Sequence, residues 1–125
     1  MKIRAILTII IFTICANSFA KRVAPKKVEP LIHGNFVYIA PHFTNIDGTN
    51  QNGGYIEVLD AKSGVKLWGL LVYKTEYDPD LEKDIQDVFI KSLSINFLGT
   101  KLTVTDELGR QYEINISDKS VTKTK

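Results

Sequence analysis

The chain has 125 residues, of which 44% are hydrophobic and 24% are charged, and its 16 Lys and Arg are set against 14 Asp and Glu. This length suits one small domain with a modest core. The near balance of charges argues against a nucleic-acid partner, since binding nucleic acid normally needs a strongly basic face.

The first twenty residues have the pattern of a signal peptide. Lys2 and Arg4 give a positive start, residues 6–15 form an apolar run, and Ser18 and Ala20 are small residues at the positions that a signal peptidase reads. We expect cleavage after Ala20, export to the periplasm or the medium, and no stable membrane insertion afterwards. An uncleaved anchor is the alternative, although a membrane span needs about 20 apolar residues.

Cysteine usage bears on how an exported chain is stabilised. Cys15 would suit a lipidation site, but Ile14 stands before it where a small residue is expected. Cleavage after Ala20 leaves 105 residues with no cysteine and a net charge near zero. Stability must then come from the core and the sheet ladders, without disulfides.

The elements that follow are mostly strands. Residues 21–32 read as an extended leader with Pro25 and Pro30, and residues 36–40 as a first strand. The turn-rich stretch 45–54 predicts a long loop. Residues 55–60 and 65–73 predict a hairpin. Its second strand is apolar on both faces, which favours a place at the centre of the domain.

One helix is expected, over about residues 79–89. Asp78 is a suitable N-cap and Pro79 suits the first helical position. The apolar residues follow the spacing of one buried helical stripe: Leu81, Ile85, Val88 and Phe89.

Three further strands complete the expected fold. Residues 89–97, 101–105 and 110–116 alternate apolar and polar side chains, with turns at Gly99 and Gly109. The sequence therefore predicts one mostly β domain over residues 33–117, with about six antiparallel strands and one short helix, followed by a polar tail over residues 118–125.

A weak internal repeat links the two halves. The pattern that begins at Tyr55 and ends at Lys66 aligns without gaps on the one that begins at Tyr112 and ends at Lys123, 57 residues later. Gly34 and Gly99 match further upstream. Each unit would be a strand, a loop, a strand and a turn, with the helix between the units. The simpler alternative is that short hairpins resemble one another.

The hairpin also carries a family likeness. Asp60, Ser63, Gly64 and Trp68 stand in the order Asp-x-x-Ser-Gly-x-x-x-Trp, which resembles the repeat of quinoprotein-like (PQQ-type) β-propellers. The resemblance implies two propeller-blade-like units, with Asp60 capping the turn, Gly64 ending it in a left-handed conformation and Trp68 packing between sheets. It implies no cofactor here, because a propeller needs about four to eight blades and this chain has room for two.

The candidate ligand-binding residues lie in and beside the long loop. They are His42, Asn45, Asp47, Asn50 and Asn52. The loop oxygens are of the kind that calcium prefers, although no EF-hand pattern is completed. The alternative is that they only form turns. The sequence predicts no catalytic residue and no metal site, since the predicted exported chain has no cysteine and the sequence contains only two histidines.

These observations predict a non-catalytic exported interaction module that binds a protein or an envelope component. Self-association through exposed edge strands is a related expectation. The alternative is a small ligand-binding or calcium-binding protein that uses the loop over residues 43–54. A small hydrolase comes third, because two carboxylates at a suitable distance are all that such chemistry requires.

Overall fold

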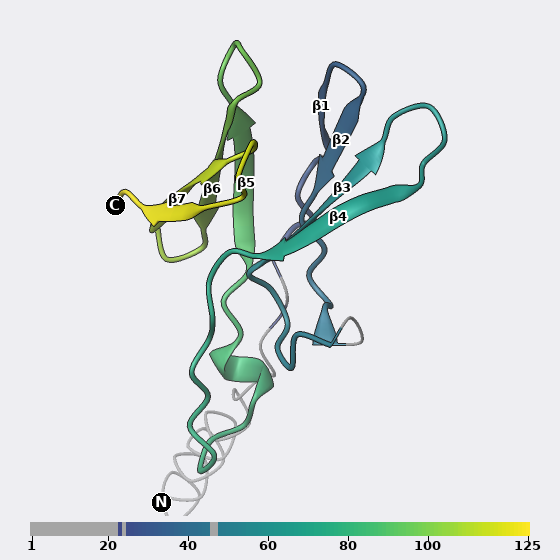
Figure 1. Ribbon diagram of the computed structural model, residues 1–125. Coiled ribbons are helices and arrows are strands. Elements are labelled where there is room, and N and C mark those ends of the chain that lie inside the picture. Colours follow the sequence, from purple (N-terminus) through teal and green to yellow (C-terminus); the bar gives the residue numbers. More distant parts are fainter. Residues whose placement is uncertain (1–22, 24, 46–47) are drawn as a thin grey trace, which may run out of the picture.

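Two four-stranded antiparallel sheets make up the fold. The computed structural model describes Val23, residues 25–45 and residues 48–125 (Figure 1). The first sheet contains β1 (Leu31–His33), β2 (Phe36–Ile39), β3 (Tyr55–Asp60) and β4 (Lys66–Leu71). The second contains β5 (Ile90–Ile95), β6 (Lys101–Asp106), β7 (Gln111–Asn115) and β8 (Val121–Lys123). In both sheets the strands lie side by side in chain order.

The mostly β antiparallel class is confirmed, whereas the expected number of six strands is wrong. The structure describes eight strands, and the two that the sequence did not predict are β1 and β8. Each has three residues, which is too short for an alternating pattern to be recognised. The predicted signal peptide lies outside the described residues. In the described part of the chain no helix is long and apolar enough to span a membrane.

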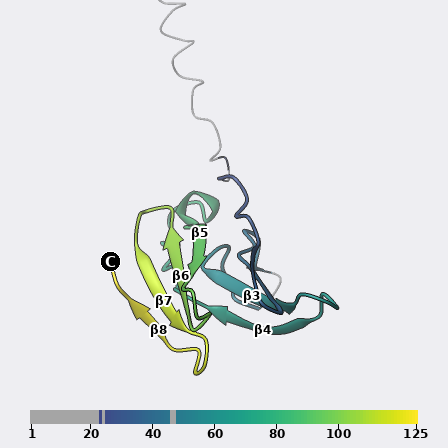
Figure 2. The same cartoon turned by 90° about the horizontal axis from the view of Figure 1, so that it is seen from above.

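The two sheets are closest at β1 and β5 (Figures 1 and 2), and His33 at the end of β1 reaches the β5–β6 turn, where its Nε2 lies 3.2 Å from the Phe97 carbonyl oxygen. Between them lies a core of side chains from both inner faces. In the first sheet Tyr38 and Val58 are cross-strand partners, and both are almost fully buried. In the second sheet the fully buried Leu102 and Ile114 are partners in the same way. Alternation along each strand thus turns one apolar row inward.

The outer faces of the two sheets differ in chemistry. On the first sheet one cross-strand row contains Ile32, Val37 and Leu59, which alternate with core residues and therefore face outward, and it ends at Lys66 of β4, the partner of Leu59. We call its three apolar members the apolar outer face. The corresponding row on the second sheet is polar throughout, and it consists of Ser94, Thr103, Glu113 and Thr122.

The strand over residues 65–73 does not lie at the centre of the domain as expected. Its structured part, β4, is an edge of the first sheet. Val65 remains 60% exposed and Leu67 remains 49% exposed. The register shifts between Val58 and Leu59, so Leu67 falls at an irregularity and leaves the regular alternation. Apolar residues on both faces therefore did not indicate a central strand here.

The helix expected over residues 79–89 is also wrong. This segment contains only one short 3₁₀ turn, η2 (Asp84–Gln86). Leu81 is 56% exposed and Ile85 is 48% exposed, so the predicted buried stripe is not formed. The Gln86 side chain accepts a hydrogen bond from the Asp78 backbone N–H at 2.6 Å and donates one to the Asp78 carbonyl at 3.1 Å. These bonds close a compact loop, and so short a segment gains little from helix propensity alone.

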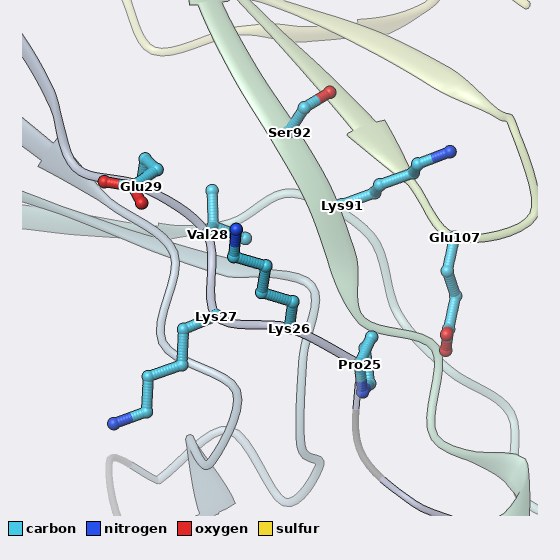
Figure 3. Close-up of a pocket in the computed structure, with 8 residues that line it drawn as sticks. All are labelled: Pro25, Lys26, Lys27, Val28, Glu29, Lys91, Ser92 and Glu107. Carbon is cyan, nitrogen blue, oxygen red and sulfur yellow. The ribbon is translucent and has the colours of Figure 1, made fainter.

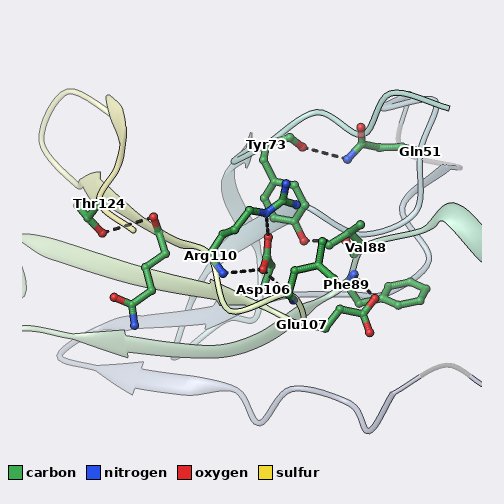
Figure 4. Close-up of polar contacts among 10 residues, drawn as sticks. Gln51, Tyr73, Val88, Phe89, Asp106, Glu107, Arg110 and Thr124 are labelled. Carbon is green, nitrogen blue, oxygen red and sulfur yellow. Dashed lines mark hydrogen bonds and ion pairs between the residues drawn. The ribbon is translucent and has the colours of Figure 1, made fainter.

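A buried polar cluster joins the sheets to the loops at their base (Figure 4). The Tyr73 hydroxyl donates to the Val88 carbonyl at 2.6 Å, and its ring stacks on Tyr112 with centroids 5.1 Å apart. Arg110 lies over the Tyr73 ring at 5.6 Å and donates from Nε to the fully buried Asp106 carboxylate at 2.6 Å. Burial raises the pKa of Tyr73 far above its usual value, so this phenol stays protonated as a donor.

The close packing at Gly53 gives a test of this arrangement. Gly53 has a φ of +81°, and a Cβ there would lie 2.5 Å from the Val88 carbonyl oxygen. Gly53→Ala should therefore cost about 2–4 kcal/mol of unfolding free energy, measured by urea denaturation, from backbone strain and overpacking together. Gly64 has a similar φ of +74° but open space around it, so Gly64→Ala should cost only about 1–2 kcal/mol. Equal costs would contradict the close approach of the loop to Val88.

Candidate functional site

The predicted ligand-binding loop is held together by its own polar groups. Thr44 Oγ1 donates to the Gln51 carbonyl at 2.7 Å, and Thr49 Oγ1 donates to the same carbonyl at 2.8 Å. Thr44 and Gln51 are almost completely buried. The Gln51 amide also donates to the carbonyl of Tyr73 at 3.0 Å (Figure 4) and accepts from the Thr75 N–H at 2.8 Å. Composition alone gave no signal that Gln51, rather than an Asn, organises the loop.

The candidate Asn residues take part in contacts that hold the loop together. Asn52 Oδ1 accepts from the Asn45 N–H at 3.4 Å, and Asn52 Nδ2 donates to Asp87 at 3.4 Å. Asn50 has a φ of +59°, and its carbonyl accepts from the Lys83 ammonium at 3.0 Å. The Asn50 backbone oxygen therefore already accepts a hydrogen bond from a positively charged side chain.

Two further observations concern the metal alternative. The fourth loop candidate, Asp47, lies outside the described residues. Among the residues that the structure describes, no group of three or more His, Cys, Asp or Glu side chains could hold a metal ion.

His42 lies apart from the Asn residues, in a different environment. It is only 8% exposed, and its ring packs on Phe89 with centroids 4.7 Å apart. Its Nε2 atom is buried and has no hydrogen-bond partner among the residues that the structure describes. A buried polar atom left unpaired costs about 1–3 kcal/mol, and in the described part of the chain Thr75 Oγ1 is in the same position.

The ionisation of His42 follows from its surroundings. Burial lowers its pKa most, the nearby Glu107 carboxylate opposes this, and the Lys27 ammonium lowers the pKa further. The imidazole is therefore neutral at pH 7, with one nitrogen protonated and one carrying a lone pair.

A cavity of about 330 Å³ opens beside His42. We call it the His42 cavity. Its other lining residues come from the leader, from the last residue of β2 and from the chain that follows it, and they are Lys27, Val28, Ile39, Ala40, Pro41 and Phe43. Phe43 is 66% exposed, so an aromatic ring lies at the solvent-facing part of the lining. The volume lies near the lower end of the range for small-molecule sites, which is about 300–1,000 Å³.

A second, larger hollow of about 550 Å³ lies on the other side of the leader (Figure 3). We call it the leader hollow. Residues 25–29 line it together with Lys91, Ser92 and Glu107. Lys27 and Val28 line both spaces, so the leader forms the wall between them. In Figure 3 the Lys27 side chain extends away from β5.

The hairpin motif has the local geometry that its sequence suggests. Asp60 Oδ2 accepts from the Ser63 hydroxyl at 2.7 Å, and Gly64 has a φ of +74°. The hydrogen bond to Ser63 is the main cause that lowers the pKa of the Asp60 carboxyl. Trp68 is partly buried and packs against the core, and Lys119 of the second sheet lies 4.9 Å from its ring.

The turn between β7 and β8 repeats that geometry, in a different register from the sequence alignment. In each turn the first residue donates to the carbonyl five positions later, in the pairs Asp60–Val65 and Asn115–Ser120. Asn115 stands 55 residues after Asp60, whereas the gapless alignment has an offset of 57. Lys119, with a φ of +63°, takes the place that Gly64 has in the first turn.

Comparison with protein-family models gives no match to this chain, and comparison with curated proteins gives no significant match. The site is therefore described by its own geometry alone.

We expect His42 to titrate below the ordinary histidine value of about 6.5. In the folded chain its neutral form is favoured, so the unfolded state takes up this proton first as the pH falls. Its contribution to stability is then present above about pH 6.5 and decreases as the pH drops through that value. The measurement is the imidazole ¹⁵N shift followed across a pH series. A midpoint at or above 6.5 would show that Glu107 outweighs burial.

The partial burial of Trp68 sets the expected cost of removing it. Trp68→Ala should lower the unfolding free energy by about 1–2 kcal/mol, since full burial of such a ring would cost about 3–5. Lys119→Met tests the contact across the sheets, and it should cost at most about 1 kcal/mol. Chemical denaturation of both variants measures these losses. A loss of 3 kcal/mol or more for Trp68→Ala would mean that the indole is a core residue.

Proposed function

We propose that this chain is a non-catalytic exported interaction module that binds a partner protein or an envelope component through its first sheet. The observation that carries the proposal is the difference between the two outer faces. Ile32 on the apolar outer face is 69% exposed, and its neighbours Val37 and Leu59 are only partly buried. The corresponding cross-strand row of the second sheet presents hydroxyl and charged groups instead. Because exposed apolar patches often mark interaction sites, the apolar outer face is a suitable surface for a partner to cover.

The architecture supports a finer version of this proposal, in which the two sheets are propeller-blade-like units. Each is a four-stranded antiparallel meander, and they approach each other at their first strands. In a closed propeller a neighbouring blade covers each sheet face. Two units cannot close such a ring, so the apolar outer face is where a further blade would lie. The partner would take that place with an apolar surface of its own.

The open edge of β4 adds a second point of contact. The leader hollow places residues 25–29 beside Lys91 and Ser92 of β5, and β1 lies close to β5. The other two sheet edges are β4 and β8, and β4 is twice as long. An edge strand can add a strand from a partner or from a second copy of the chain.

The test compares two variants that each add one negative charge to an outer face. Ile32→Glu with Val37→Thr alters the apolar outer face, and Ser94→Glu with Thr103→Val alters the cross-strand row of the second sheet. The exported chain, beginning at Lys21, is immobilised and incubated with native envelope extract. We expect the wild-type chain and the second variant to retain the same partner and the first variant to lose it by about tenfold or more.

Two controls make the result decisive. Urea denaturation should show that both variants stay folded, with changes much smaller than the several kcal/mol typical of core substitutions. Light scattering separates a second copy of the chain from a different partner. Equal retention by both variants, or no specific partner for the wild-type chain, would contradict the proposal.

A further inference from the structure

The turn between β5 and β6 carries two of the most exposed large apolar side chains in the described part of the chain. Phe97 is 94% exposed and Leu98 is 76% exposed, and they are the two central residues of a turn that projects beyond the ends of both strands (Figure 1). We call this pair the apolar tip. Residues 92–100 contain no charged side chain, so no charge has to be desolvated if the turn leaves water.

The polar groups around the apolar tip are paired within the protein. The Gly99 N–H donates to the Asn96 carbonyl at 3.0 Å, and Asn96 Oδ1 accepts from the Thr100 N–H at 2.8 Å. The Phe97 carbonyl oxygen lies 3.2 Å from His33 Nε2, and a Cβ on Gly99 would lie 2.5 Å from the His33 ring. The turn is therefore held closely against β1, and the pairing of its polar groups lowers the cost of moving it into an apolar medium.

The turn between β6 and β7 has the same framework and a different tip. The Gly109 N–H closes this turn in the same way, by donating to the Asp106 carbonyl at 3.0 Å, and Glu107 takes the place of Phe97. A charged residue is thus compatible with the turn geometry. The exposed Phe97 ring also has little to pack against in its own chain. Neither the turn nor the core explains the apolar tip.

The distribution of charge favours a lipid surface as the partner of the apolar tip. Residues 74–87 carry six Asp and Glu against two Lys, and this acidic segment lies at the end of the molecule away from the β5–β6 turn (Figure 1). Insertion of the tip would keep these carboxylates away from anionic headgroups. A bilayer also accepts a projecting tip without a preformed pocket, whereas a protein partner would need a pocket of matching shape.

We propose that the β5–β6 turn inserts into a lipid surface, with the side chains of Phe97 and Leu98 at the boundary between headgroups and acyl chains. Two side chains bury little apolar area, so binding is weak and reversible. The predicted export brings the chain to such a surface. The apolar tip is separate from the apolar outer face, so this proposal does not depend on the proposed function.

Vesicle flotation with the exported chain, beginning at Lys21, measures the binding. The vesicles contain phosphatidylethanolamine and phosphatidylglycerol in equal parts. We expect the wild-type chain to float with them, and Phe97→Ser combined with Leu98→Ser to weaken binding about tenfold or more. Added salt should leave binding nearly unchanged, because the tip carries no charge. Binding that salt abolishes would come from lysines at the surface and would overturn the proposal.

Matched variants locate the contact. Leu108 is 65% exposed in the β6–β7 turn, where the Glu107 N–H bonds to the Phe89 carbonyl just before β5, so it lies at the other end of the sheet. Leu108→Ser should float like the wild-type chain. Ile32→Glu alters the apolar outer face and should also float, so failure of this proposal is distinct from failure of the proposed function. Urea denaturation should show that the tip variant stays folded, because both replaced side chains are exposed.

A tryptophan at the tip reports insertion directly. Brominated lipids quench a tryptophan only at close range, and the partly buried Trp68 of the wild-type chain provides the baseline. Phe97→Trp should therefore lose more fluorescence than the wild-type chain does. The proposal is overturned if the wild-type chain does not float, if Phe97→Trp is quenched no more than the baseline, or if Leu108→Ser loses as much binding as the tip variant. An apolar tip that binds an envelope protein but no vesicles would also overturn it.

Discussion

The position of Tyr73 is the constraint on which the rest of the molecule depends. This residue follows β4, and its ring and hydroxyl reach the second sheet and the chain before β5, while its carbonyl accepts from the loop residue Gln51. One side chain thus joins both sheets and both long connections. A buried phenol must find a hydrogen-bond partner, so its place in the core also fixes the place of Val88. The close approach of Gly53 to Val88 follows from the same arrangement.

Much of the fold could be predicted from short-range patterns, and the failures have physical reasons. Alternation identified β6 and β7, because Leu102 and Ile114 are buried every second residue along short, regular strands. It could not place β4 at an edge, because an edge depends on what lies beside a strand. The helix failed because the Gln86 side chain bonds to Asp78, eight residues away, which no periodicity reports. Of the candidate site, His42 was found from its place beside the loop. Gln51 was missed, because only tertiary contacts give it a role.

The two sheets show how similar topologies can serve different ends. Both are meanders with equivalent hairpin turns, and both turn an apolar row inward to a shared core. They differ on the outside, where the first sheet keeps Ile32, Val37 and Leu59 and the second keeps hydroxyl and charged side chains. The shared core explains the stability of the pair, whereas the outer faces need separate reasons. A solvated sheet face is ordinary, and an apolar one calls for something to cover it.

The leader is the wall between the two hollows, although it belongs to neither sheet. If the chain is cleaved after Ala20 as its sequence predicts, residues 25–29 lie close to the amino terminus, where trimming by proteases is most common. Loss of residues 25–27 would leave both sheets intact and would open both hollows, and loss of Val28 would also remove a side chain that packs against the core. The position at which the leader begins therefore decides whether a folded molecule possesses these hollows, so two forms of nearly equal mass would differ in the surface they present.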